Sequence, residues 1–142
     1  MASKVLFSSV NFDKYDADVT LPAKFSRMID RMGMQDVVKD KWTAIKMHLG
    51  RNIGYSTIHP LFVKILVDKL QEYGAKVYIT DNVVSGARSR GYTEEFLGVP
   101  IVPVCGYLDK YFYEKMVDFK TFKHVDVGGY IHDAEVMINL SH

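Results

Sequence analysis

Hydrophobic and polar residues along this chain follow two spacings, one typical of helices and one typical of buried strands. Helical spacing predicts a helix that begins near Pro22 and ends at Gly33, and another that begins at Pro60 and ends at Gly74. Short apolar runs predict the strands, which are Lys4–Val10, Trp42–Leu49, Lys76–Thr80, Ile101–Val104 and Val136–Leu140. Strands therefore alternate with helices, which is typical of an α/β protein.

The strand–helix–strand unit in the middle of the chain defines the expected architecture. Its two strands should be parallel, because the helix between them carries the chain back across the sheet. Thr93 is expected to cap a short helix. Residues 107–127 lack helical periodicity, and Gly128-Gly129 is typical of a turn. We predict one domain over residues 1–142, an α/β, Rossmann-like three-layer domain with a mostly parallel sheet and an irregular or hairpin-like insertion after the fourth strand.

The composition is that of a soluble globular protein. Of the 142 residues, 48% are hydrophobic and 25% are charged, and the formal net charge is +1. This balance argues against nucleic acid or a membrane surface as a partner. The single cysteine, Cys105, cannot form an internal disulfide, and no apolar run is long enough to span a bilayer. Because no apolar leader precedes the first predicted strand, we expect a cytoplasmic protein.

The segment Ile45–Pro60 carries polar side chains where a buried strand should still be apolar. Lys46 and His48 share one face of the predicted strand, because side chains alternate along a strand. Arg51 and His59 follow in a loop that contains glycines. The carboxyl end of a strand in a parallel sheet is a common ligand position. The loop lacks the Walker and dinucleotide-binding glycine patterns, so by itself it is better explained as a connection.

Two further predicted strands end in polar residues, at Asp81 and Asn139. If the strands are parallel, these residues meet Lys46 and His48 along one edge of the sheet. Basic side chains at that edge suit a phosphate or a carboxylate group. In the competing interpretation Lys46 extends to solvent, His48 is a hydrogen-bonded core histidine and Asp81 stabilises a turn. We predict no metal site, because the adjacent ammonium disfavours a cation and the histidines lack metal-ligand spacing.

Other features give weaker indications of chemistry. Cys105 is expected to be a small buried residue, because the sequence shows no base that would activate its thiol. His132-Asp133 could form an acid–base pair, although the surrounding residues are typical of a turn. Arg88 and Arg90 could reach an anion, although exposed arginines are commoner. An aromatic cluster is expected to pack in the core and at the sheet edge, or to form a partner surface; its members are Tyr107, Tyr111, Phe112, Tyr113, Phe119 and Phe122.

Four segments of the chain occur in a characteristic order. They are I-K-M-H-L-G-R, T-I-H-P-L-F-V-K, G-A-K-V-Y-I-T-D-N and H-D-A-E-V-M-I-N-L-S-H. Together they resemble the domain-of-unknown-function 362 family, whose members are commonly labelled uncharacterised iron–sulfur centre proteins. The positions that match the family pattern are Lys46, His59-Pro60, Asp81, Asp133 and Asn139. The family pattern continues past the position of His142, so the resemblance implies the amino-terminal portion of a longer family domain.

The resemblance implies an α/β fold and leaves the activity open. Many members carry a ferredoxin-type module, whose cluster needs four cysteines, and this chain has one. We therefore expect no cofactor in this chain, and an iron–sulfur cluster only in longer relatives. The favoured hypothesis is an amino-terminal region of an iron–sulfur-associated protein that binds a small anionic molecule. The residues expected to bind it are Lys46, His48, Arg51, His59, Asp81 and Asn139.

Two other functions stay open. One is an enzyme that acts on a small carboxylate or phosphate, with His48 or His59 as its acid–base group. The other is a structural or partner-binding domain, with the aromatic segment Tyr107–Phe122 as its interface. Because the last predicted strand leaves a sheet edge or an apolar face uncovered, we also expect self-association or marginal stability. A redox partner is the other candidate partner.

Overall fold

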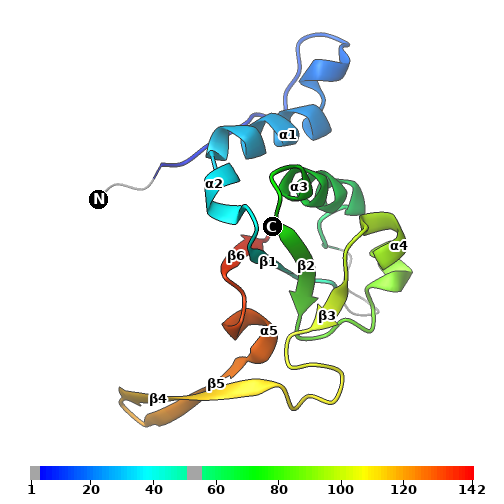
Figure 1. The fold of residues 1–142 in the computed structure, drawn as a ribbon. Helices are drawn as coiled ribbons and strands as arrows, with labels where there is room; N and C mark the ends of the chain where they lie inside the picture. Colours follow the sequence, from blue (N-terminus) through cyan, green and yellow to red (C-terminus); the bar gives the residue numbers. More distant parts are fainter. Residues whose placement is uncertain (1–3, 51–55) are drawn as a thin grey trace.

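Four parallel strands form the sheet at the centre of the molecule (Figure 1). The computed structural model describes residues 4–50 and 56–142. The strands of this sheet are β1 (Trp42–Met47), β2 (Lys76–Asp81), β3 (Ile101–Pro103) and β6 (Val136–Leu140). Their order across the sheet is β3-β2-β1-β6, and every neighbouring pair is parallel. The end of β1 therefore has a neighbouring strand on both sides.

Seven helical segments and one hairpin make up the other described elements. The helical segments are η1 (Ala17–Val19), α1 (Leu21–Met32), α2 (Gln35–Val38), α3 (Pro60–Glu72), η2 (Arg88–Arg90), α4 (Glu94–Leu97) and α5 (Gly129–His132). The antiparallel hairpin consists of β4 (Phe112–Phe119) and β5 (Phe122–Gly128). In the described parts of the chain, no helix combines the length and apolar character that a membrane span requires.

The hydrophobic core lies between the sheet and the helices α1 and α3, which cover one of its faces (Figure 1). The ring of Phe25 on α1 packs edge-on against Phe62 on α3, with 5.5 Å between the ring centres. The buried residues of α3 are Val63, Leu66, Val67 and Leu70. Their spacing places them on one side of the helix, toward Ile45 and Ile79 of the sheet. The structure confirms both long helices.

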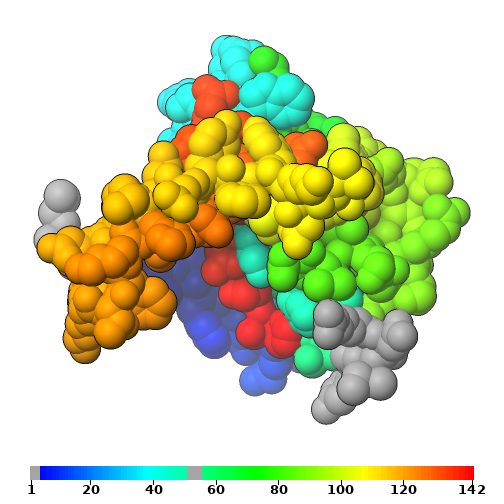
Figure 2. All heavy atoms as spheres, turned by 90° about the horizontal axis from the view of Figure 1, so that it is seen from below, coloured from blue at the N-terminus to red at the C-terminus, as the bar shows by residue number. Residues whose placement is uncertain are grey.

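The other face of the sheet carries the alternate residues of each strand. On β1 these are Trp42, Ala44 and Lys46. Figure 2 shows the molecule from below, with the yellow segment before the hairpin in front and the orange hairpin projecting to one side. The hydroxyl of Tyr78 on β2 donates a hydrogen bond to the carbonyl of Tyr130 on α5. This face is therefore lined by the hairpin region and one short helix.

Most sequence predictions of the secondary structure are confirmed. The mixed α/β class, the parallel sheet and the hairpin after β3 are present. Thr93 caps α4, because its side-chain oxygen accepts the N–H of Phe96 at 3.1 Å. The Rossmann-like three-layer arrangement, and the interpretation of the hairpin as an insertion, stay predictions.

The strand predicted at Lys4–Val10 is wrong, because these residues form no strand. Val5 and Phe7 are 85% and 88% exposed. The ammonium of Lys24 on α1 donates a hydrogen bond to the carbonyl of Ser9 at 2.9 Å, which ties the segment to a helix. A strand requires the backbone of a neighbouring strand, and among the described residues no strand pairs with this segment.

The turn predicted at Gly128-Gly129 is also wrong. Gly128 ends β5 and Gly129 begins α5, so the chain does not reverse there. A Cβ added to Gly128 would lie 2.6 Å from a methyl of Val104, and one added to Gly129 would lie 2.5 Å from the ring of Tyr111. The two glycines therefore permit close packing at the base of the hairpin.

Candidate functional site

Three of the predicted site residues, Lys46, His48 and Asp81, meet at the carboxyl ends of β1 and β2. Lys46 Nζ lies 3.4 Å from Asp81 Oδ1, and His48 Nδ1 lies 3.5 Å from Asp81 Oδ2. The aspartate side chain is 8% exposed, whereas those of Lys46 and His48 are 43% and 56% exposed. One buried carboxylate therefore holds two partly exposed basic groups, and the interpretation of His48 as a core histidine is wrong.

Main-chain N–H groups hold the Asp81 carboxylate in place. The N–H of Leu49 donates to Oδ2 at 3.0 Å, and the N–H of Asn82 donates to Oδ1 at 2.8 Å. Leu49 is fully buried, so its N–H depends on the carboxylate as an acceptor in the folded protein. Leaving such an N–H without a partner costs roughly 1–3 kcal/mol. Asp81 thus joins the end of β1 to the end of β2 and also positions the two basic side chains.

The side chain of Arg90 lies against Gly50, the residue that follows Leu49. A Cβ added to Gly50 would lie 2.4 Å from Arg90 Nε. Gly50 also has a φ of +80°, a left-handed conformation that side chains disfavour. The structure therefore brings an arginine from the segment after β2 to the loop after β1. The arginine side chain thus lies beside the loop that follows β1.

The remaining predicted site residues are placed differently. Asn139 on β6 is the register partner of Lys46, so both residues lie on the same face of adjacent strands. His59 is the N-cap of α3, where its Nδ1 accepts the N–H of Leu61 at 3.2 Å. Across the described ranges, no hydrogen bond or ion pair joins His59 to the cluster around the buried carboxylate. Arg51 lies outside the described residues.

A second cluster surrounds Asp133, just before β6. Its carboxylate lies 2.7 Å from His132 Nδ1, and it accepts hydrogen bonds from the hydroxyls of Tyr111 and, at 3.3 Å, Tyr113. The hydrogen bond with His132, and then that with Tyr111, lowers the pKa of Asp133. The hydrogen bond to Asp133 in turn raises the pKa of the Tyr111 phenol. The predicted His132-Asp133 pair is present, as part of a larger network that the sequence did not indicate.

The aromatic cluster is exposed, so the prediction that it packs in the core is wrong. Its members Tyr107, Tyr111, Phe112, Tyr113, Phe119 and Phe122 are between 37% and 78% exposed. The hairpin that carries most of them is a separate two-stranded sheet, which leaves side chains on β4 open to solvent. Cys105 is half-buried, and burial raises the pKa of its thiol.

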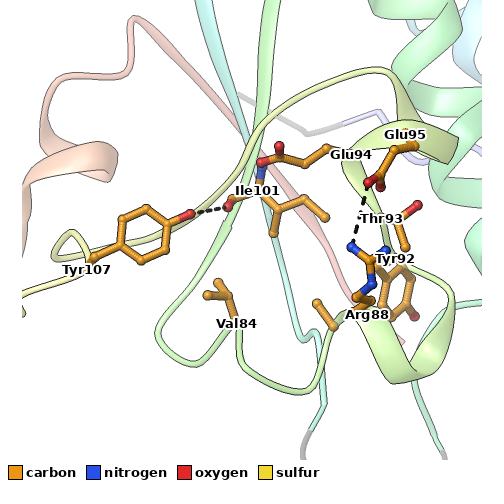
Figure 3. Close-up of a pocket in the computed structure, with 9 residues that line it drawn as sticks. Val84, Arg88, Tyr92, Thr93, Glu94, Glu95, Ile101 and Tyr107 are labelled. Atoms are coloured by element: carbon orange, nitrogen blue, oxygen red, sulfur yellow. Dashed lines mark hydrogen bonds and ion pairs between the residues drawn. The ribbon is translucent and has the colours of Figure 1, made fainter.

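A cavity of about 210 Å³ beside α4 is lined by polar groups that bind one another (Figure 3). Arg88 lies 3.6 Å from the carboxylate of Glu95, and Figure 3 shows the two side chains turned toward each other. The carboxylate of Glu94 accepts the N–H of Ile101 at 2.9 Å. These contacts account for the charged groups that line the cavity, and we assign no ligand to it.

The residues of this chain do not fit an iron–sulfur cluster of the ferredoxin type. Such a cluster takes four thiolates, and the sequence contains one cysteine. In the portion of the chain that the structure describes, no three His, Cys, Asp or Glu side chains gather closely enough to hold a metal ion. The cluster around Asp81 is instead composed of two basic groups and one acid.

The sequence model of one protein family matches most of the chain. The family is described as Domain of unknown function (DUF362), and the match covers residues 43–142. The chain belongs to the DUF362 family. Every candidate site residue lies in the matched DUF362 region, whereas α1 and α2 precede it. Comparisons with curated proteins and with solved structures found no match.

Proposed function

We propose that this DUF362 chain binds a small anionic molecule, through a phosphate or carboxylate group, at the carboxyl ends of β1, β2 and β6. The observation that carries the proposal is the position of Lys46 and His48 on one buried carboxylate. A lysine ammonium has three N–H donors, so the contact with Asp81 leaves donors for a ligand. Asp81 would thus fix both basic groups in place before a ligand arrives, which reduces the entropy lost on binding.

The charges around this site support an anion. When His48 is protonated, the two basic groups outnumber the one carboxylate. Asn139 lies beside Lys46 on the neighbouring strand and offers an amide that can orient a ligand oxygen. Figure 2 shows the red end of the chain close to the teal residues of β1 at this edge of the sheet.

The test is binding of inorganic phosphate, measured by calorimetry on the whole chain and on two matched lysine variants. Lys46→Met removes the charge at the site and keeps most of the side-chain volume, so it should weaken binding about tenfold, the scale of one charge-assisted hydrogen bond. Lys76→Met is the control, because Lys76 lies at the other end of β2, roughly 17 Å from Asp81 along the strand. Equal affinities of the wild type and Lys46→Met would contradict the proposal.

A second function is favoured by the contact between His48 and Asp81. A carboxylate beside Nδ1 favours the tautomer with its proton on Nδ1, which leaves Nε2 of this partly exposed side chain as a base. We infer that such a site could transfer protons during hydrolysis of a phosphate or carboxylate ester. With p-nitrophenyl phosphate as the probe, His48→Gln should abolish a pH-dependent turnover. A turnover that His48→Gln leaves unchanged would exclude this role of His48.

We include the Rossmann-like arrangement, the cytoplasmic location and the association with an iron–sulfur protein in the same proposal. A Rossmann-like arrangement would place the ligand at the strand ends, as parallel α/β sheets commonly do. A cytoplasmic location agrees with the single cysteine. Association with an iron–sulfur protein would require cluster ligands from outside this chain.

A further inference from the structure

A second cavity, of about 360 Å³, lies on the sheet face away from α1 and α3 and is lined mainly by aromatic side chains. Trp42 comes from β1, Tyr78 from β2, Tyr111 from the segment before β4 and Tyr130 from α5. Asp133 adds a carboxylate to the lining. The volume is in the range of small-molecule sites. None of these residues belongs to the site around Asp81.

The rings around this cavity are inclined to one another and do not stack flat. Tyr78 lies 6.3 Å from Trp42 at 57° and 5.9 Å from Tyr130 at 63°, measured between ring centres. Tyr111 is nearly perpendicular to Tyr130, at 87° and 5.2 Å. Hydrogen bonds from the hydroxyl of Tyr78 to the Tyr130 carbonyl, and from that of Tyr111 to Asp133, hold two of the rings. The aromatic rings therefore line the cavity at several different orientations.

The charge at this cavity is suited to a cation. Aromatic ring faces attract cations, and the indole of tryptophan does so most strongly. The ammonium of Lys76 already lies 5.8 Å from the centre of the Trp42 ring. Hydrogen bonds from His132 and Tyr111 lower the pKa of Asp133, and the carboxylate of Glu135 accepts the main-chain N–H of Trp42 at 2.8 Å. The carboxylate of Asp133 thus adds a negative charge to the lining of the cavity, and that of Glu135 lies at the backbone of Trp42.

We propose that this cavity binds a small organic cation with a quaternary ammonium group, of which choline is the simplest probe. A primary ammonium needs hydrogen-bond acceptors, whereas Asp133 already accepts bonds from His132, Tyr111 and Tyr113. A quaternary ammonium has no N–H to satisfy and is weakly hydrated, so ring faces and one nearby negative charge are sufficient to bind it.

Trp42 is the only tryptophan of the chain, so its fluorescence reports on this cavity directly. We expect choline to change the emission saturably. The uncharged analogue 3,3-dimethylbutan-1-ol has the same shape and should bind about tenfold more weakly, because it gains no cation–π or carboxylate attraction. Equal affinities for choline and the alcohol, or no saturable response to choline, would overturn the proposal.

Matched variants separate the aromatic contribution from folding. Tyr111→Leu should weaken choline binding several-fold, whereas Tyr111→Phe keeps the ring and should bind within about twofold of the wild type. Lys76→Met removes a competing positive charge and should strengthen binding. Circular dichroism checks that each variant is folded. Folded Tyr111→Leu with wild-type affinity would contradict the proposal, as would binding of a trimethyllysine peptide in the absence of choline binding.

Discussion

Asp81 and Asp133 each hold a histidine, but the two aspartates are supported in different ways. Asp81 is almost fully buried and accepts main-chain N–H groups from two strand ends. The side chain of Asp133 is 44% exposed and is held by tyrosine hydroxyls from the segment before and within β4. The first aspartate is part of the sheet, whereas the second joins the hairpin region to the sheet. Substitution of Asp81 and of Asp133 should therefore lower the free energy of unfolding by different amounts.

The clusters also differ in the ligand charge that they favour. Around Asp81 the partners are Lys46 and His48, with Arg90 near the adjoining loop. Around Asp133 they are phenols, a histidine and the aromatic cavity. One sheet can thus present a basic edge at the strand carboxyl ends and an aromatic, acidic cavity closer to the amino ends. Substitutions in each cluster can test this contrast.

Asp81→Ala should lower the free energy of unfolding by about 2–3 kcal/mol, because the buried N–H of Leu49 loses its acceptor. Asp81→Asn keeps one carbonyl oxygen as an acceptor, so its free energy of unfolding should fall by less. Urea unfolding of both variants measures the difference. Asp133→Ala should lower the free energy of unfolding by less than Asp81→Ala, because the hydrogen-bond partners of Asp133 are partly exposed and can bind water instead. An equal loss at the two positions would remove the distinction between the aspartates.

Gly50→Ala should destabilise the chain by about 2 kcal/mol, through its left-handed φ and through the contact with Arg90. Gly98 has a similar φ of +76° but no atom within 4 Å of an added Cβ. Gly98→Ala should therefore cost only the backbone part, about 1 kcal/mol. Thermal unfolding of the pair isolates the effect of Arg90. A larger loss for Gly98→Ala than for Gly50→Ala would exclude that contact.

The network around Asp133 should make stability depend on pH in two directions. The pKa of the Asp133 carboxyl is lower in the folded protein than its ordinary value of 3.8. Asp133 therefore stabilises the folded state above pH 3.8, and this contribution is lost as the pH falls through the lower folded pKa. The raised pKa of Tyr111 contributes stability below 10.0, lost as the pH rises toward the higher folded value. Asp133→Asn should flatten the acid side of a plot of urea midpoint against pH, and Tyr111→Phe the alkaline side. Unchanged curves would show that the network does not form in solution.

Arg88→Ala should change the free energy of unfolding by less than about 0.5 kcal/mol, since Arg88 and Glu95 are both exposed. Chemical unfolding of this variant provides the lower end of the scale against which the aspartate variants are judged. A loss above about 1 kcal/mol would mean that the cavity beside α4 has a structural role that surface ion pairs rarely have.

Several elements could be predicted because their cause is local. Pro60 begins a helix and Thr93 caps one through contacts with residues a few positions away. The strand at Val136–Leu140 follows from a short run of mostly apolar residues, V-M-I-N-L. By contrast, Lys4–Val10 has an equally strand-like pattern and forms none, because a strand depends on a neighbour that lies elsewhere in the sequence.

The candidate site shows the same division. The sequence alone determined which strands end in polar residues, because alternation and the ends of apolar runs are local properties. Only the tertiary structure brings the carboxylate of Asp81 to the N–H of Leu49, 32 positions away. It also brought together rings from residues 42, 78, 111 and 130 around one cavity. Such contacts depend on strand register and on the packing of distant segments, neither of which is encoded in the spacing of neighbouring residues.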